Sequence, residues 1–195
     1  MSETSAALSL VDAVASRRSV RSFTADRLDP KVVRGLLSAA VRAPTAIHQE
    51  PWSFVIVQSK ALLKRISDRA KPLFLDEMHR AHIDRGGHAP ALFADPAFNI
   101  FHDAGTLIVI CGNATRPYVV ADCWLAAENL MLAAVAAGLG TCVIGSAVAA
   151  LDTDEIRREL DIPQDITAIA PIVVGVPAAD GAPSPRKEPR ILAWK

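Results

Sequence analysis

Two short basic clusters lie near opposite ends of the chain, and their residue types could bind a phosphate group. They comprise Arg17, Arg18, Ser19 and Arg21 near the start, and Arg186 and Lys187 near the end. A guanidinium group carries a permanent charge and a planar fork of donors that matches phosphate oxygens, and a serine hydroxyl adds a short donor. A run of arginines is more often a solvated surface. The phosphate interpretation therefore depends on the rest of the chain.

The length fits one domain, and the composition is more hydrophobic than a domain of this size requires. The chain has 195 residues, and its 21 Lys and Arg balance its 21 Asp and Glu, so nothing indicates a protein that grips the backbone of nucleic acids. Hydrophobic residues make up 51% and charged residues 22%, which predicts apolar surface buried against a second subunit. We expect a single domain over residues 1–195, in which residues 177–195 form an extended, proline-rich arm.

The N-terminus and the cysteines favour the cytoplasm. Residues 1–4 lack the cationic start of a secretory signal. Cys111, Cys123 and Cys142 are odd in number, lie in apolar runs and form no Cys-x-x-Cys motif. We interpret them as core thiols in a reducing compartment.

One stretch, residues 130–151, carries no charge and is long enough to cross a bilayer. Gly138 and Gly140 interrupt it, and its helical pattern begins further back, among polar residues that include Asp122 and Glu128. A buried helix followed by a strand explains this stretch better than a membrane span.

Helices and strands are expected in a mixed α/β order. Apolar residues at helical spacing predict helices over residues 8–14, 30–41 and 119–137, and from residues 60 and 152 onward. Aromatic and β-branched runs predict strands over residues 52–57, 106–111, 141–144 and 166–176. Residues 71–103 show no clean period.

Two helix starts carry sequence signals of their own. Asp29 is a good N-cap, and Pro30 suits the first helical position. Asp152 is followed three residues later by Glu155, which is the spacing of a capping box. The first basic cluster follows directly after the short helix over residues 8–14.

Five motifs in this order and spacing resemble the nitroreductase family of FMN-dependent oxidoreductases, and they leave only about residues 62–102 unmatched. The motifs lie at residues 17–23 (RRSVRSF), 43–52 (APTAIHQEPW), 126–130 (AAENL), 138–145 (GLGTCVIG) and 185–187 (PRK). The resemblance implies an α+β fold, with a central mixed β-sheet flanked by helices. It also implies an intertwined homodimer that binds two FMN molecules at the subunit interface.

The activity that the resemblance implies is a ping-pong reaction. NADH or NADPH reduces the FMN, and the flavin then reduces a nitroaromatic, a quinone or a related small electrophile. The cofactor carries the electrons while the protein positions and tunes it. No side chain of this chain is predicted to be a catalytic acid or base.

The resemblance also assigns cofactor-binding residues. Arg17 and Ser19, with Arg18 beside them, are similar to ligands of the FMN phosphate and ribityl chain, and Arg186 and Lys187 would close on the same phosphate. Arg21 is similar to the cation near the flavin pyrimidine edge. The remaining positions border the flavin ring: Pro44, Thr45, Ala46, His48, Ile144 and Gly145. At Gly145 a plain turn glycine is an equal alternative to a close approach of the ring.

Some positions depart from the family pattern. His48 stands where Asn is usual, and Glu50 stands where Gln is usual. Histidine changes charge near neutral pH, so His48 could donate a proton or bind an anionic substrate group. It could also replace Asn as a simple hydrogen-bond donor to the flavin. Ser146 stands where a second Gly is frequent.

The other histidines predict no metal site. His79 and His82 share a helical face, and His88 and His102 follow. No cysteine or matched carboxylate completes a zinc site near them.

Two alternatives to a broad reductase stay open. A specialised flavin enzyme of the same superfamily, such as a reductive dehalogenase, would use residues 71–103 as a lid that selects one substrate. A non-catalytic flavin-binding protein would result if the changes at His48 and Glu50 had disabled reduction.

Overall fold

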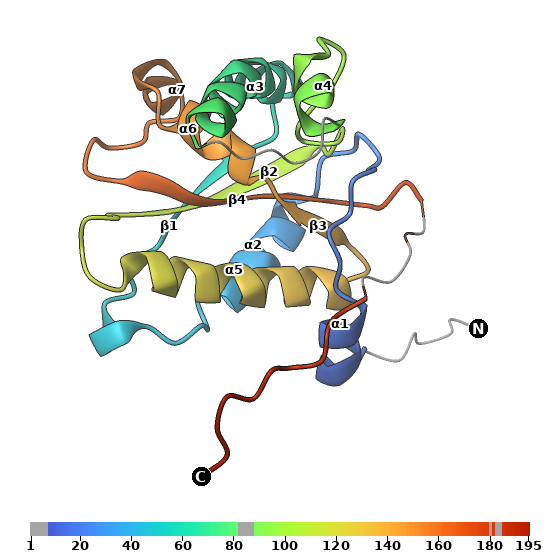
Figure 1. The fold of residues 1–195 in the computed structure, drawn as a ribbon, viewed down its shortest axis with the longest axis vertical. Helices are drawn as coiled ribbons and strands as arrows, with labels where there is room; N and C mark the ends of the chain where they lie inside the picture. Colours follow the sequence, from blue (N-terminus) through green and yellow to red (C-terminus); the bar gives the residue numbers. More distant parts are fainter. Residues whose placement is uncertain (1–7, 82–87, 180, 182–184) are drawn as a thin grey trace.

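The computed structural model describes residues 8–81, 88–179, 181 and 185–195, and helices cover both faces of one four-stranded sheet (Figure 1). The strand order is β1-β2-β4-β3, with bounds Ser53–Val57, Thr106–Gly112, Thr167–Gly175 and Gly140–Val143 respectively. The predicted α+β class is confirmed. The expected mixed pairing needs correction, because these strands all pair antiparallel and the described residues add a single parallel bridge, between Ser19 and Thr141. Strand direction depends on the edge to which each connection returns, and residue types do not encode it.

The central strand β2 divides the core into two layers. All seven of its residues are buried, and successive side chains of a strand point to opposite faces. Leu107 and Val109 belong to the hydrophobic core between the sheet and α3. Ile108 and Ile110 belong to the hydrophobic core between the sheet and α5. A strand buried on both faces is a continuous apolar run, and that run is why the sequence predicts β2 well.

The helices form one layer on each face of the sheet (Figure 1). One face carries α1, α2 and α5, with bounds Leu10–Ser16, Pro30–Ala40 and Val119–Ala136. The other face carries α3, α4, α6 and α7, with bounds Lys60–Arg80, His88–Ala94, Val148–Leu151 and Asp154–Glu159. Two 3₁₀ turns, η1 at Ala46–His48 and η2 at Gly145–Ala147, carry residues predicted to bind the cofactor.

The N-caps of α2 and α3 follow local sequence signals. The carboxylate of Asp29 accepts a hydrogen bond from the N–H of Lys31 at 2.7 Å, and Pro30 is the first helical residue. The hydroxyl of Ser59 accepts from the N–H of Leu62 at 3.3 Å. Both predicted starts are confirmed.

Helix α3 continues into the region without a clean period. It passes through Pro72 and ends at Arg80. Pro72 has no N–H to donate, but the buried residues Ile66 and Ala70 anchor the turn before it. Tertiary packing thus outweighs the local helix-breaking signal.

Asp152 does not open a helix as the capping-box spacing predicts. It follows the last residue of α6, and its Oδ1 accepts from Nη1 of Arg157 at 3.3 Å and from the N–H of Ala168 at 3.2 Å. Burial raises the pKa of Asp152, and those two donors oppose the rise. Helix α7 instead begins at Asp154, after Thr153. Local spacing cannot distinguish a cap from a carboxylate that a distant strand uses.

Helix α5 is long and apolar enough to cross a membrane by length and composition. Here it packs on the sheet and on α2, and its buried residues include Cys123, Ala127 and Leu130. Its opposite side leaves Trp124 and Leu125 41% and 46% exposed. A core helix with a second apolar face describes α5 better than a membrane span.

Lys71 fastens the loop before β2 to helix α3. Its ammonium group is buried and donates to the carbonyls of Asp95, Pro96 and Phe98 at 3.2, 3.2 and 3.0 Å. The carboxylate of Asp68 lies 3.5 Å away. A buried charge is tolerated only when it is compensated in this way.

Replacing Lys71 by Met should destabilise the protein by about 1–3 kcal/mol, because the carbonyls lose their donor. Chemical denaturation measures the change. The matched control is Lys64→Met, which removes an exposed lysine that also pairs with Asp68 and should cost at most about 1 kcal/mol. Equal losses in the two variants would contradict this role of Lys71.

Candidate functional site

The first basic cluster lies between α1 and the edge strand β3. Arg17 is the C-cap of α1, and its Nε lies 3.3 Å from Oε1 of Glu128 on α5. Val20 donates its N–H to the carbonyl of Thr141 at 2.9 Å. The cluster therefore follows a short helix, as predicted, and backbone bonds hold it along β3.

The Gly145 turn lies at the end of the same strand. The N–H of Ile144 donates to the carbonyl of Pro171 at 2.8 Å, and the Ile144 side chain is buried. Gly145 is exposed, and nothing lies within 4 Å of a Cβ built on it. The packing of this chain does not require glycine there. The space beside Gly145 is open to a ligand or a second chain.

A cavity of about 610 Å³ adjoins this turn. Its walls are Gly145, Val148 and Ala149 on one side, and the second half of α3 on the other, with Leu73, Glu77, Arg80 and Ala81. The first part of the segment predicted as a lid thus faces the Gly145 turn. Residues 82–87 of that segment, which include His82, lie outside the described residues.

The charge of Arg21 influences two ionisable side chains, Cys142 on β3 and His102 in the loop before β2. Burial raises the pKa of Cys142, while the charge of Arg21 and the hydroxyl of Ser19 oppose the rise. Burial also lowers the pKa of His102, and the Arg21 charge lowers it further. No sequence signal linked His102 to Arg21, because 81 positions separate them.

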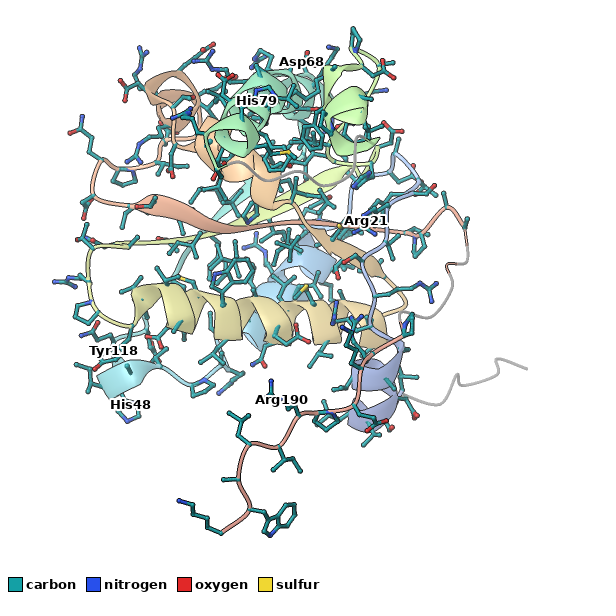
Figure 2. The ribbon with its side chains drawn as sticks, viewed as in Figure 1. Arg21, His48, Asp68, His79, Tyr118 and Arg190 are labelled. Atoms are coloured by element: carbon teal, nitrogen blue, oxygen red, sulfur yellow. The ribbon has the colours of Figure 1, made fainter. Side chains whose placement is uncertain are left out.

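The loop with Pro44, Thr45, Ala46 and His48 lies at the other end of α5. The N–H of Ala46 lies 3.2 and 3.3 Å from the two carboxylate oxygens of buried Asp122. Figure 2 shows His48 beside Tyr118 near the first turn of α5, and Arg21 near its opposite end, on the side of the sheet. The eighteen residues of α5 span about 27 Å. One small ligand therefore cannot contact both groups in the same chain.

The same loop holds an unusual backbone. Ile47, His48 and Glu50 have φ values of 48°, 54° and 43°. Left-handed conformations of non-glycine residues cost about 1–3 kcal/mol each, and a β-branched residue such as Ile47 is a true outlier. Such strain persists only where surrounding contacts impose it.

The second basic cluster is not brought to the first within one chain. Arg186 and Lys187 are exposed, and Nη1 of Arg186 donates to the carbonyl of neighbouring Pro185 at 3.4 Å. The arm leaves the body near α1 and passes below α5 (Figures 1 and 2). Trp194 at its end is 88% exposed.

The cysteines are core thiols, as predicted. Cys111, Cys123 and Cys142 are free and buried. Burial raises the pKa of Cys111 to about 12 and that of Cys123 to about 11, so both remain protonated and unreactive at neutral pH. The described residues contain no group of three side chains suited to a metal ion.

A sequence profile of the Nitroreductase family matches residues 14–175. The chain belongs to the nitroreductase family. A 5,6-dimethylbenzimidazole synthase of Rhodospirillum rubrum is 30% identical over 92% of this chain and 85% of that protein. An NADH dehydrogenase of Thermus thermophilus is 24% identical over 94% of each chain. The FMN-bound nitroreductase structure from Bacteroides fragilis has a TM-score of 0.80 at 22% identity, over 95% of this chain and 98% of that one, which confirms the fold.

Asp122 is a site residue that sequence reasoning missed, and its role can be tested. Asp122→Ala should free the Ala46 amide, increase its hydrogen exchange and cost about 1–3 kcal/mol of stability. Asp122→Asn keeps one acceptor oxygen and is the matched control, for which we expect slower exchange than in the alanine variant. Unchanged exchange at Ala46 in Asp122→Ala would show that the carboxylate does not hold this loop.

Proposed function

We propose that this nitroreductase-family protein is an FMN-dependent oxidoreductase. It takes electrons from NADH or NADPH and reduces a nitroaromatic, a quinone or another small electrophile in a ping-pong cycle. The observation that carries the proposal is that one strand, β3, positions both features: the first basic cluster pairs with Thr141 near its start, and the open Gly145 turn follows its end. Together they provide a cationic end for one phosphate and an unobstructed backbone for a flat ring.

The residues fit FMN better than a dinucleotide. Arg17, Arg18 and Ser19 would hold the phosphate and ribityl chain, and the side chain of Arg21 would lie near the pyrimidine edge, where a fixed cation favours added negative charge. A Cβ at Gly145 would occupy the open space that a ring needs. The bound flavin would supply the electron-transfer chemistry.

The division of predicted residues between the two ends of α5 supports a homodimer. A second copy could bring its loop with Pro44, Thr45, Ala46 and His48 to the first basic cluster, and its arm could bring Arg186 and Lys187. The exposed residues Trp124 and Leu125 on α5 and Trp194 on the arm offer apolar surface for such pairing. We further propose that the dimer acts in the cytoplasm, which the free, buried cysteines favour.

A specialised member of the family is the second candidate. The cavity between α3 and the Gly145 turn supports it, because Glu77 and Arg80 put charges of both signs on a wall that a substrate would meet. Narrow substrate use, with slow reduction of simple nitroaromatics and quinones, would favour this candidate. A flavin-binding protein without catalysis would show no turnover with either nicotinamide.

The purified protein should carry FMN, and Arg17→Ala should weaken FMN binding about 10- to 150-fold, the equivalent of a charge-assisted hydrogen bond of about 1.5–3 kcal/mol. Flavin released on denaturation identifies the cofactor, fluorescence titration gives its affinity, and turnover with NADH and NADPH tests the activity. Arg65→Ala is the matched control, because Arg65 also pairs with a glutamate, Glu159, but on the opposite face. A protein that binds no FMN would end the proposal.

Mixing two defective variants tests whether both chains form each site. One variant carries Arg17→Ala with Arg21→Ala, and the other carries Thr45→Glu with His48→Glu. Each homodimer should bind FMN poorly. Heterodimers formed after mild unfolding and refolding together should regain one intact site per dimer. No regain of flavin absorbance, with heterodimers present by mass spectrometry, would place each site within one chain.

A further inference from the structure

The loop that leads into β2 lies directly against the segment that follows the first basic cluster. A Cβ on Gly105 would stand 2.3 Å from the carbonyl oxygen of Asp26, so only glycine permits this contact. Phe23 of that segment packs into the same core cluster as Phe101 and Ala104. The contacts place the His102 loop beside the segment that begins at Arg21.

The backbone at His102 is held in an unusual conformation. His102 and Asp103 have φ values of 54° and 63°. The N–H of His102 donates to the carbonyl of Asn99 at 3.0 Å, and the amide of Asn99 donates to the carboxylate of Asp103 at 3.2 Å. Consecutive left-handed residues outside glycine store strain, which is found preferentially at functional sites.

The His102 ring is also fixed by packing. It meets the Phe98 ring edge-on, with a centroid separation of 6.1 Å and an angle of 62°. Phe98 belongs to the loop that Lys71 fastens to α3 through its carbonyl. The imidazole therefore has a set orientation in a loop that lies beside the segment following Arg21.

Three influences act on the charge of this ring among the described residues. Burial lowers the pKa of His102 most, the Arg21 cation lowers it further, and the Asp103 carboxylate raises it. His102 is therefore neutral at pH 7. A new negative charge near Arg21 would act in the opposite sense and favour the imidazolium.

We propose that His102, rather than His48, is the residue that takes up a proton when the flavin site gains electrons. The inference rests on the proposed function. NAD(P)H delivers a hydride, which carries two electrons and one proton, and leaves as NAD(P)⁺. The site then holds one more negative charge, and His102 takes one proton from water. When a quinone takes two electrons and two protons, one proton comes from the flavin and the second from His102. His102 is thereby neutral again.

The test is the number of protons taken up when the FMN-loaded protein is reduced anaerobically, measured with a pH indicator between pH 5.5 and 8.5. The wild type should take up as much as one proton more per flavin than His102→Asn, over a pH window whose lower limit is the His102 pKa in the oxidised protein. Asn is chosen because it tolerates a left-handed φ. The matched control is His79→Asn, which removes an exposed histidine on α3 and should take up as many protons as the wild type. His48→Asn tests the competing assignment.

A second measurement guards against a purely structural effect. The ring resonances of His102 in the oxidised, FMN-loaded protein should titrate at a lower pH than those of an unperturbed histidine, and Arg21→Gln should move that midpoint upward. Equal proton uptake in wild type and His102→Asn, with FMN bound and the fold intact by circular dichroism, would overturn the inference. If His48→Asn loses the extra proton and His102→Asn keeps it, the residue that takes up the proton is His48. Absence of FMN binding in the wild type would instead refute the proposed function.

Discussion

The candidate site depends on the main-chain hydrogen bonds that attach residues 19–24 to the sheet. Val20 donates to the carbonyl of Thr141 on β3. Thr24 donates to the carbonyl of Val176, just past β4, at 3.0 Å. These bonds use main-chain groups, which must be paired wherever they are buried. The basic cluster, the Gly145 turn and the start of the C-terminal arm therefore share one frame, and the position of each follows from the strand edge rather than from its own side chains.

The fold was predictable where the signals are local. The run buried on both faces of β2, the cap at Asp29 and the apolar length of α5 are each encoded within a few residues, and the structure confirms them. Pairing direction and the true start of α7 were not, because they depend on contacts between distant segments. Asp152 shows the reason: its partners on α7 and β4 decide its role, and one of them is 16 positions away.

The candidate site divides in the same way. The resemblance to a family indicated the basic clusters and the Gly145 turn, since those motifs are short and contiguous. Asp122 was missed because it reaches its place through a hydrogen bond with Ala46, 76 positions away. His102 was missed because its loop is positioned by the close approach of Gly105 to Asp26, which are also far apart in sequence. The separation of the His48 loop from Arg21 could not be predicted either. Both belong to motifs of one family, but a motif does not indicate at which end of α5 its residues lie.

The length of α5, which separates the two groups of candidate ligands, would make cofactor binding depend on the concentration of the protein. On the proposed arrangement, each cofactor is held by two chains, so cofactor loading obeys mass action in protein as well as in flavin. Dilution would release flavin even at a constant free flavin concentration, and flavin in turn would favour assembly through the free energy of its binding. A cell could then set the fraction of active protein through its total amount, without any separate regulator.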